Sequence, residues 1–421
     1  MTASNSQPTP WIPAARLVRP SAGLACLCMT GIASATIDYN PFATIDVQHN
    51  SNVFSLPDKQ SLAPGSSFED TITHYIIGGT ADFDWGGPDR LAINAQGSRF
   101  QYAENTTQSH WESRFGGLFD WRLGPVFSGT LSYTQARTLS APGDTLSQQL
   151  ELQTDRTVGG AFRTLVTPRW RVDLAPQWHQ LDSPLPLFPE FGYRETSAAV
   201  SILYLGISKL TAGVRGSYLD GSFHHIVDAT KYNQKSAQLT STYAVTGLTS
   251  FDMQVGYTWR NSSLINPADA TDAGVVGPQG TILGSSNSFT GALGVNRQLT
   301  VKTGVNLRAF RDVESSAAGA NPQISTGVEG GIRWAPDFRF TLNLSYRYAK
   351  ENIQGTQAIS DFAGRNDRIN AAEFSVKYQA FSWLSVRPYG SRYTRHSNLE
   401  RASYNSTLVG IDFSAMLHPP K

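Results

Sequence analysis

Compared with an average globular protein, this 421-residue chain has little cysteine, little charge and no long apolar run. Its two cysteines, Cys26 and Cys28, lie near the N-terminus, so the rest of the chain has neither a disulfide nor a thiolate nucleophile. Charged residues make up only 16% and the formal net charge is +1, which gives no indication of a nucleic-acid partner. No stretch approaches about 18 consecutive apolar residues, so a membrane-spanning helix is not expected.

The first 35 residues have the features of an export signal. Arg16 and Arg19 supply a positively charged segment, and the apolar stretch AGLACLCMTGIASA ends in a small-residue cleavage motif at Ala33-Ser34-Ala35. We therefore predict a signal peptide over residues 1–35 and a single domain over residues 36–421.

The stretch Arg333–Lys350, RWAPDFRFTLNLSYRYAK, alternates apolar and polar residues. One face carries aromatic and aliphatic side chains, and the other carries arginines and small polar side chains. This two-residue period is that of a β-strand and differs from the 3.6-residue period of a helix. The two faces consist of Phe338, Phe340, Leu342, Leu344, Tyr346 and Tyr348 against Arg339, Thr341, Asn343, Ser345 and Arg347.

The same pattern recurs along the whole chain, with short breaks rich in Gly and Pro that suit tight turns. Each break separates two alternating segments of roughly ten residues. Longer polar connections lie between these pairs, at residues 140–147, 182–191, 220–235, 261–287, 312–323 and 351–367. The breaks are centred near Gly87, Gly124, Pro168, Gly206, Gly247, Arg297, Pro336 and Ser382.

These pairs, with one strand over Pro41–His49 and one over Ser406–Met416, give about eighteen strands, within a range of sixteen to twenty. A β-sandwich also alternates, but aromatic residues here gather near the segment ends, as in the girdles of a membrane barrel. Propeller blades would need four strands in each repeat of this length. We therefore predict an all-β transmembrane antiparallel up-and-down barrel with short periplasmic turns and long extracellular loops.

A barrel of this size leaves an aqueous lumen that side chains cannot fill. The polar strand faces predict a lumen lined by arginines and lysine, with aspartates among them. Such a track suits an anionic or hydroxyl-rich solute, although the same charges would also be present if they only paired across strands. The candidate lumen-lining residues are Arg169, Arg171, Asp173, Asp252, Arg260, Lys302, Arg308, Arg339, Arg347, Arg387 and Asp412.

Three stretches carry a resemblance to a known family. The segment NPFATIDVQHNSNVFSLPD, Asn40 to Asp58, resembles the N-terminal signature of the EpsL-type exopolysaccharide-operon outer-membrane proteins, which are related to the putative β-barrel porin 2 family. The segments FGGLFDWRLGPVFSGTLSYTQARTLS and TPRWRVDLAPQW resemble the repeated hairpins of that family. The resemblance implies a location in the bacterial outer membrane and a part in exopolysaccharide biosynthesis or export. It implies as partners the outer-membrane lipid, exopolysaccharide, other export components and the barrel-assembly machinery.

No motif indicates an enzyme, a cofactor or a metal. The nucleophile elbow G-x-S-x-G and the zinc motif H-E-x-x-H are both absent from the sequence. The pair His224-His225 and the acidic pair Asp269 and Asp272 lie in long polar connections and lack the spacing of a metal site. Together with the predicted barrel, the resemblance to the EpsL-type proteins implies a polysaccharide-conducting channel. The alternatives are a general diffusion porin and a structural or assembly barrel plugged by its loops.

Overall fold

The computed structural model describes residues 36–140, 148, 151–182, 192–224, 230–264, 282–315, 322–354 and 364–417, and almost all of them form β-strands. The expected signal peptide lies outside the described residues. No helix in the described ranges is long and apolar enough to cross a membrane. The strands are β1 (Thr36–Asn50), β2 (Asp70–Asp84), β3 (Arg90–Tyr102), β4 (His110–Leu123), β5 (Phe127–Leu139), β6 (Leu152–Thr167), β7 (Trp170–Asp182), β8 (Gly192–Ile207), β9 (Leu210–His224), β10 (Thr230–Thr246), β11 (Thr249–Leu264), β12 (Ile282–Thr300), β13 (Thr303–Ser315), β14 (Pro322–Trp334), β15 (Phe340–Ile353), β16 (Asn366–Phe381), β17 (Leu384–Ser397) and β18 (Tyr404–Met416).

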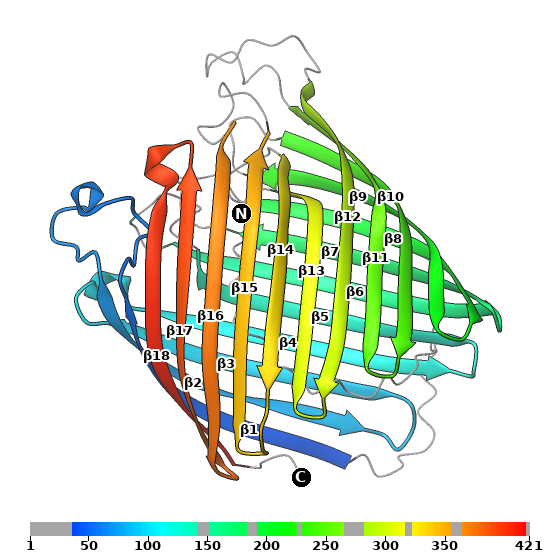
Figure 1. Cartoon of the computed structure of the whole chain (residues 1–421), viewed down its shortest axis with the longest axis horizontal. Coiled ribbons are helices and arrows are strands. Elements are labelled where there is room, and N and C mark those ends of the chain that lie inside the picture. The colour runs from blue at the N-terminus through cyan, green and yellow to red at the C-terminus, as the bar shows by residue number, and fades with distance from the viewer. Residues whose placement is uncertain are drawn as a thin grey trace.

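All 18 strands belong to one antiparallel sheet, in which each strand pairs with its neighbours in the sequence. The first and last strands also pair with each other, from Phe42 opposite Met416 to Asn50 opposite Leu408, and this pairing closes the sheet. Figure 1 shows β12–β18 crossing in front of β2–β7 at a large angle, as tilted strands do on opposite walls of a barrel. The predicted fold class, including the strand number, is confirmed.

The short turns lie where the breaks in the sequence predicted them, with small shifts at two positions. The break near Arg297 lies inside β12, where Arg297 is paired with both Thr249 and Val305, and the actual turn is at Val301 and Lys302. The break near Gly206 lies at the end of β8, and its turn follows at Ser208 and Lys209. The two turns lie later in the sequence than predicted for the same reason. In both hairpins the strands stay paired through their backbone for a few residues beyond the point where the alternation of apolar and polar residues stops.

The strands are longer than the sequence predicted, because their loop-side ends are mostly polar and do not show the apolar alternation. Strand β12, for example, has 19 residues, whereas a tilted strand needs only about 9–11 to cross a bilayer. Segments such as Asp220–His224 and Asn261–Leu264, which were expected to be loop, are paired strand. Their polar residues gain nothing from lipid, but the backbone hydrogen bonds continue to hold them in the sheet.

The outward face of the barrel carries a continuous belt of apolar side chains. Ile77, Leu239 and Leu307 are 70%, 58% and 57% exposed, values that a water-soluble protein avoids for side chains repeated around a whole sheet. Aromatic residues border the belt on both sides, with Trp170 beside Tyr204 at the short-turn end and Trp259 beside Tyr257 at the loop end. This arrangement is that of a barrel surrounded by hydrocarbon.

The first loop, residues 51–69, is anchored by the motif NSNVF, Asn50 to Phe54, which begins at the last residue of β1. The Asn52 amide donates to the backbone carbonyls of Leu56, at 2.8 Å, and of Asn405, at 2.9 Å, which links the loop to the start of β18. Phe54 is buried beside it. Farther along, Asp58 accepts hydrogen bonds from the backbone and hydroxyl of Ser61, and these bonds lower the pKa of the Asp58 carboxyl. The motif therefore has a structural role in seating the loop.

Candidate functional site: the lumen wall

The alternation in each strand decides which side chains face the lumen. In β15, Leu344 and Tyr346 are exposed on the lipid side, so Asn343, Ser345 and Arg347 lie on the opposite face. Directly opposed residues on neighbouring strands share a face of the sheet. The pairing register therefore shows, strand by strand, which residues face the lumen and which face lipid. The lumen wall then divides into three regions of different chemistry.

The first region, the paired-charge sector, covers the lumen faces of β13–β18 and β1. Four arginines of these strands lie within ion-pair distance of carboxylates on the same strand or on a neighbouring one: Arg308, Arg347, Arg387 and Arg395. Arg308 contacts Glu329 at 3.0 Å and Asp312 at 3.3 Å. Arg347 lies 3.9 Å from Glu351. These pairs neutralise most of the charge that this sector presents to the lumen.

The seam between β17, β18 and β1 holds the densest part of this sector. Asp46 and Asp412 are directly opposed across the β1–β18 pairing, and both are more than nine-tenths buried. Arg387 bonds Asp412, and the hydroxyl of Tyr389 donates to Asp46 at 2.8 Å. Two carboxylates held side by side would repel each other, so the arginine and the tyrosine stabilise the closure of the barrel.

The second region is a cluster at the loop end of β6, β7, β8, β10 and β11. The imidazole of His179 lies 3.0 Å from Asp155 and 3.5 Å from Glu195. The Tyr232 hydroxyl donates to Glu195 at 2.6 Å, and the guanidinium of Arg260 lies 4.2 Å from the centre of the Tyr232 ring. Tyr232 and Arg260 are each 1% exposed, so this cluster packs the wall near the outer mouth.

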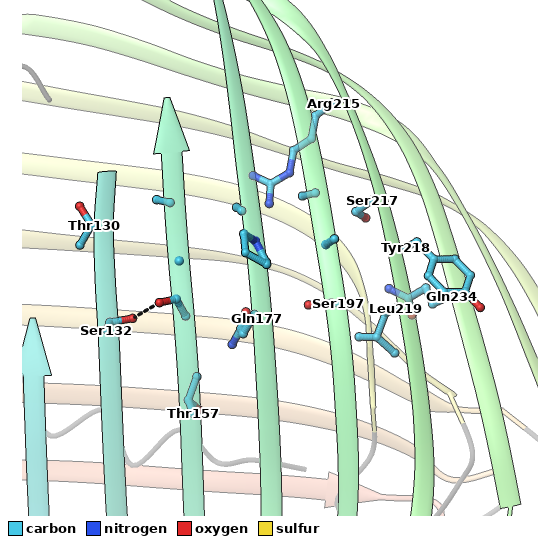
Figure 2. Close-up of a pocket in the computed structure, with 17 residues that line it drawn as sticks. Thr130, Ser132, Thr157, Gln177, Ser197, Arg215, Ser217, Tyr218, Leu219 and Gln234 are labelled. Atoms are coloured by element: carbon cyan, nitrogen blue, oxygen red, sulfur yellow. Dashed lines mark hydrogen bonds between the residues drawn. The ribbon is translucent and has the colours of Figure 1, made fainter. Parts of the chain in front are cut away.

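The third region, the small-residue groove, follows the middle of β5–β10 and has a volume of about 410 Å³ (Figure 2). Most of its lining residues carry hydroxyl, amide or methyl groups, and none is acidic. A Cβ at Gly159 would come within 2.8 Å of the Ser132 hydroxyl, so a larger residue there would push into that side chain. The lumen-facing members are Thr130, Ser132, Thr157, Gly159, Ala161, Ala175, Gln177, Ser197, Ala199, Arg215, Ser217, Leu219 and Gln234.

Arg215 is the cation of this groove. Its side chain reaches from β9 toward the β7 and β8 side of the groove in Figure 2 and is exposed. Within the described residues, no carboxylate lies at ion-pair distance from it. An exposed guanidinium surrounded by hydroxyls and amides can bind a carboxylate or phosphate and can donate to sugar oxygens. This chemistry differs from that of the paired-charge sector.

The candidate lumen residues fall into two groups by position. Eight of them lie on strands, on the face opposite the apolar belt: Arg171, Asp173, Asp252, Arg260, Arg308, Arg347, Arg387 and Asp412. The structure places the other three, Arg169, Lys302 and Arg339, in short connections beyond the strand ends.

Most of the eight strand residues have a polar or charged partner. Arg171 donates to Asp173 at 3.0 Å, and Asp252 accepts from Thr242 at 2.9 Å and from Asn296 at 3.1 Å. Sequence analysis did not single out Arg215, although its place between the outward-facing Val214 and Gly216 follows the same alternation.

The described residues contain no group of three or more His, Cys, Asp or Glu side chains that could hold a metal ion. Asp269 and Asp272, the acidic pair that lacks the spacing of a metal site, lie outside these residues, as does His225. The same holds for most of the long connection over residues 261–287.

Comparisons with known proteins found similar solved structures, all at low sequence identity. No protein-family model and no curated protein sequence matches the chain. Among solved structures, Pseudomonas aeruginosa OccK2 (OpdF) has 11% identity and a TM-score of 0.48, covering 90% of this chain and 98% of that one. Pseudomonas aeruginosa OpdK with vanillate has 12% identity and a TM-score of 0.45, with 90% and 99% covered. Acinetobacter baumannii OccAB3 has 10% identity and a TM-score of 0.44, with 90% and 100% covered.

Proposed function

We propose that this chain is a bacterial outer-membrane channel that conducts an exopolysaccharide during its biosynthesis and export. Two arguments support it. An 18-stranded barrel is wide enough to leave an aqueous lumen. The segment Asn40 to Asp58 and the later hairpins resemble the EpsL-type outer-membrane proteins of exopolysaccharide operons. The chain carries no sequence motif of an enzyme, and the proposed role is passage of a solute and not its chemical conversion.

The observation that carries the proposal is the small-residue groove with its single arginine. A polysaccharide is a long chain of hydroxyl groups, and many exported ones also bear carboxylates. Ser132, Ser197 and Gln177 offer hydroxyl and amide partners to sugar hydroxyls, and small residues leave room for a chain to slide. Arg215 offers a forked donor to a carboxylate. Weak contacts repeated along a wall favour entry without preventing exit.

Two alternatives remain open to the same test. A general diffusion porin would use the lumen without preference for sugars. A structural or assembly barrel would have its lumen closed by its loops, and the buried cluster of His179, Tyr232 and Arg260 near the outer mouth is the observation that favours it.

Conductance of the purified mature chain in a planar lipid bilayer distinguishes these functions. We expect ion-conducting steps that a uronic-acid oligosaccharide interrupts at lower concentration than a neutral oligosaccharide of equal length. Arg215→Gln should reduce this difference by about tenfold, because one charge-assisted contact contributes roughly 1.5 kcal/mol. Gln177→Ala serves as the matched control, since it alters the same groove without altering charge.

The outcomes separate the alternatives. Conductance without any block by oligosaccharides contradicts the polysaccharide role and supports a diffusion porin. The absence of conductance from correctly folded protein contradicts both and supports a closed barrel. Equal block of the native channel and of Arg215→Gln contradicts the role assigned to Arg215.

A further inference from the structure

A row of basic residues crosses the outward face of five neighbouring strands at the loop end of the barrel. Arg311 of β13 is opposed to Thr326 of β14, which is opposed to Lys350 of β15. Lys350 is opposed to Arg368 of β16, and Arg368 to His396 of β17. Directly opposed residues share a face of the sheet, so these side chains form one continuous line.

The line borders the apolar belt and faces away from the lumen. One outward position closer to the short turns on β13, β14 and β15, the residues are Ala309, Val328 and Tyr348. Val328 is 43% exposed on the lipid side, which identifies the face. The basic row therefore lies where the hydrocarbon ends and the polar head groups of the leaflet begin.

These side chains line an outward-facing groove with a volume of about 790 Å³. In the described part of the chain, no carboxylate lies within ion-pair distance of Lys350 or Arg368. Arg311 donates to the Thr326 hydroxyl at 2.9 Å. Around the cations lie four side-chain amides, those of Asn352, Gln354, Asn366 and Asn398.

The two acidic residues of the groove lining belong to the lumen side. Glu351 and Asp367 are buried, and each faces an arginine there, Arg347 at 3.9 Å and Arg365 at 2.8 Å respectively. Their charge is thus already neutralised, and it leaves the cations of the outward row available.

The outward loop-side band as a whole is basic. By the register of the described strands, the acids that face outward in this band are Asp182 and Asp220, and Asp182 pairs with Arg156 at 2.6 Å. The outward cations of the band are Arg99, Arg137, Arg156, Arg194, Lys231, Lys235, Arg311, Lys350, Arg368 and Arg392. At the short-turn end, the outward strand positions contribute Arg297.

We propose that this groove binds the phosphorylated head group of a glycolipid in the leaflet on the loop side. Arg311, Lys350 and Arg368 would bind phosphate oxygens, since guanidinium and ammonium groups are the usual phosphate donors of proteins. The three asparagine amides match sugar hydroxyls. The apolar belt directly below receives the acyl chains. The site lies on the opposite face of the sheet from the lumen, and it does not depend on the proposed transport function.

Lipid binding to the detergent-solubilised barrel tests this assignment. Diphosphorylated lipid A would be titrated against the native chain and the double variant K350Q/R368Q, with bound lipid counted by native mass spectrometry. We expect the double variant to bind on the order of tenfold more weakly, at roughly 1 kcal/mol or slightly less for each lost charge. The matched control R137Q/R194Q removes two exposed outward cations on β5 and β8 and should change binding less than about twofold.

Titrations with two further lipids test whether the groove prefers a phosphorylated glycolipid to another phosphate-bearing lipid. Phosphatidylglycerol should bind more weakly than lipid A, and dephosphorylated lipid A should bind the native chain as weakly as lipid A binds K350Q/R368Q. Equal binding of phosphatidylglycerol would overturn the glycolipid assignment. If K350Q/R368Q and R137Q/R194Q lost lipid A binding equally, lipid A would be attracted to the basic loop-side band in general. The proposal of a specific site in this groove would then be wrong. Heat-modifiable gel mobility checks that each variant is folded.

Discussion

The paired-charge sector and the small-residue groove lie on opposite walls of the same lumen and use arginine in different ways. In the sector, Arg308, Arg347 and Arg387 each lie within ion-pair distance of a carboxylate. In the groove, Arg215 is exposed and has no such partner among the described residues. The difference teaches that a lumenal arginine is not by itself a sign of solute binding. A paired arginine holds the wall together, whereas an unpaired one is available to solute.

The largest effect on stability is expected at the seam, for Arg387→Ala. Removing this guanidinium leaves Asp412 buried beside Asp46 without its cation. Breaking a buried pair costs about 3–5 kcal/mol, and because Arg387 is itself partly exposed we expect about 2 kcal/mol here. Urea unfolding of the barrel in lipid vesicles measures this loss in the free energy of unfolding.

The double variant R387A/D412N should recover most of that loss, because it removes the uncompensated carboxylate together with its partner. A loss below about 0.5 kcal/mol for R387A alone would mean that water already screens Asp412, and the structural role of the sector would be refuted.

A smaller effect is expected for Tyr389→Phe in the same seam. The change removes only the hydroxyl that donates to Asp46 at 2.8 Å and keeps the ring in place. A hydrogen bond to a charged group contributes about 1.5 kcal/mol, so we expect a loss of roughly 1 to 1.5 kcal/mol in the same unfolding assay. Tyr346→Phe is the control on the lipid side, where the hydroxyl bonds the neutral amide of Asn370. Equal losses in the two variants would contradict a special role for the seam.

The fold was predictable because lipid imposes a rule that a single sequence can show. Lipid-facing positions are predominantly apolar, so the period of two survives in segments such as Phe340–Tyr348 and sets the strand count. The strand ends beyond the bilayer obey no such rule. Asn261–Ser263 is polar on both faces, and its pairing depends on backbone hydrogen bonds that leave no mark in the residue pattern.

The sequence predicted which side chains face the lumen, but it could not predict which of them form ion pairs with each other. Alternation assigns Arg308 and Arg387 to the polar face, yet their ion pairs come from Glu329 and Asp412 on neighbouring strands. Finding those pairs requires the register between strands, which depends on turn lengths to the exact residue. Arg215 is set apart by its lack of an ion-pair partner together with its place in the small-residue groove, and both properties appear only once the register is known.

A still smaller effect on stability is expected for Arg215→Ala, within about 0.5 kcal/mol of the native chain. The exposed side chain holds no carboxylate among the described residues, so its removal leaves no buried charge behind. The unfolding assay used for R387A measures both variants in parallel. A loss as large as that of R387A would mean that Arg215 holds the wall after all, and the distinction between the two regions would disappear.

A similarly small stability change is expected when Arg215 is given a partner by Gln238→Glu. Gln238 of β10 is directly opposed to Arg215 of β9, and glutamate keeps the size of glutamine. An exposed pair adds about 0.2–1 kcal/mol, so the groove would acquire the chemistry of the paired-charge sector almost without energetic effect. Block by a uronic-acid oligosaccharide should then weaken as much as in Arg215→Gln, although the arginine is still present. Gln177→Glu adds the same charge to the groove at a position that is not opposed to Arg215, and we expect it to weaken the block less. If both glutamates weaken the block equally, the total charge of the lumen sets the preference and the pairing state of Arg215 does not.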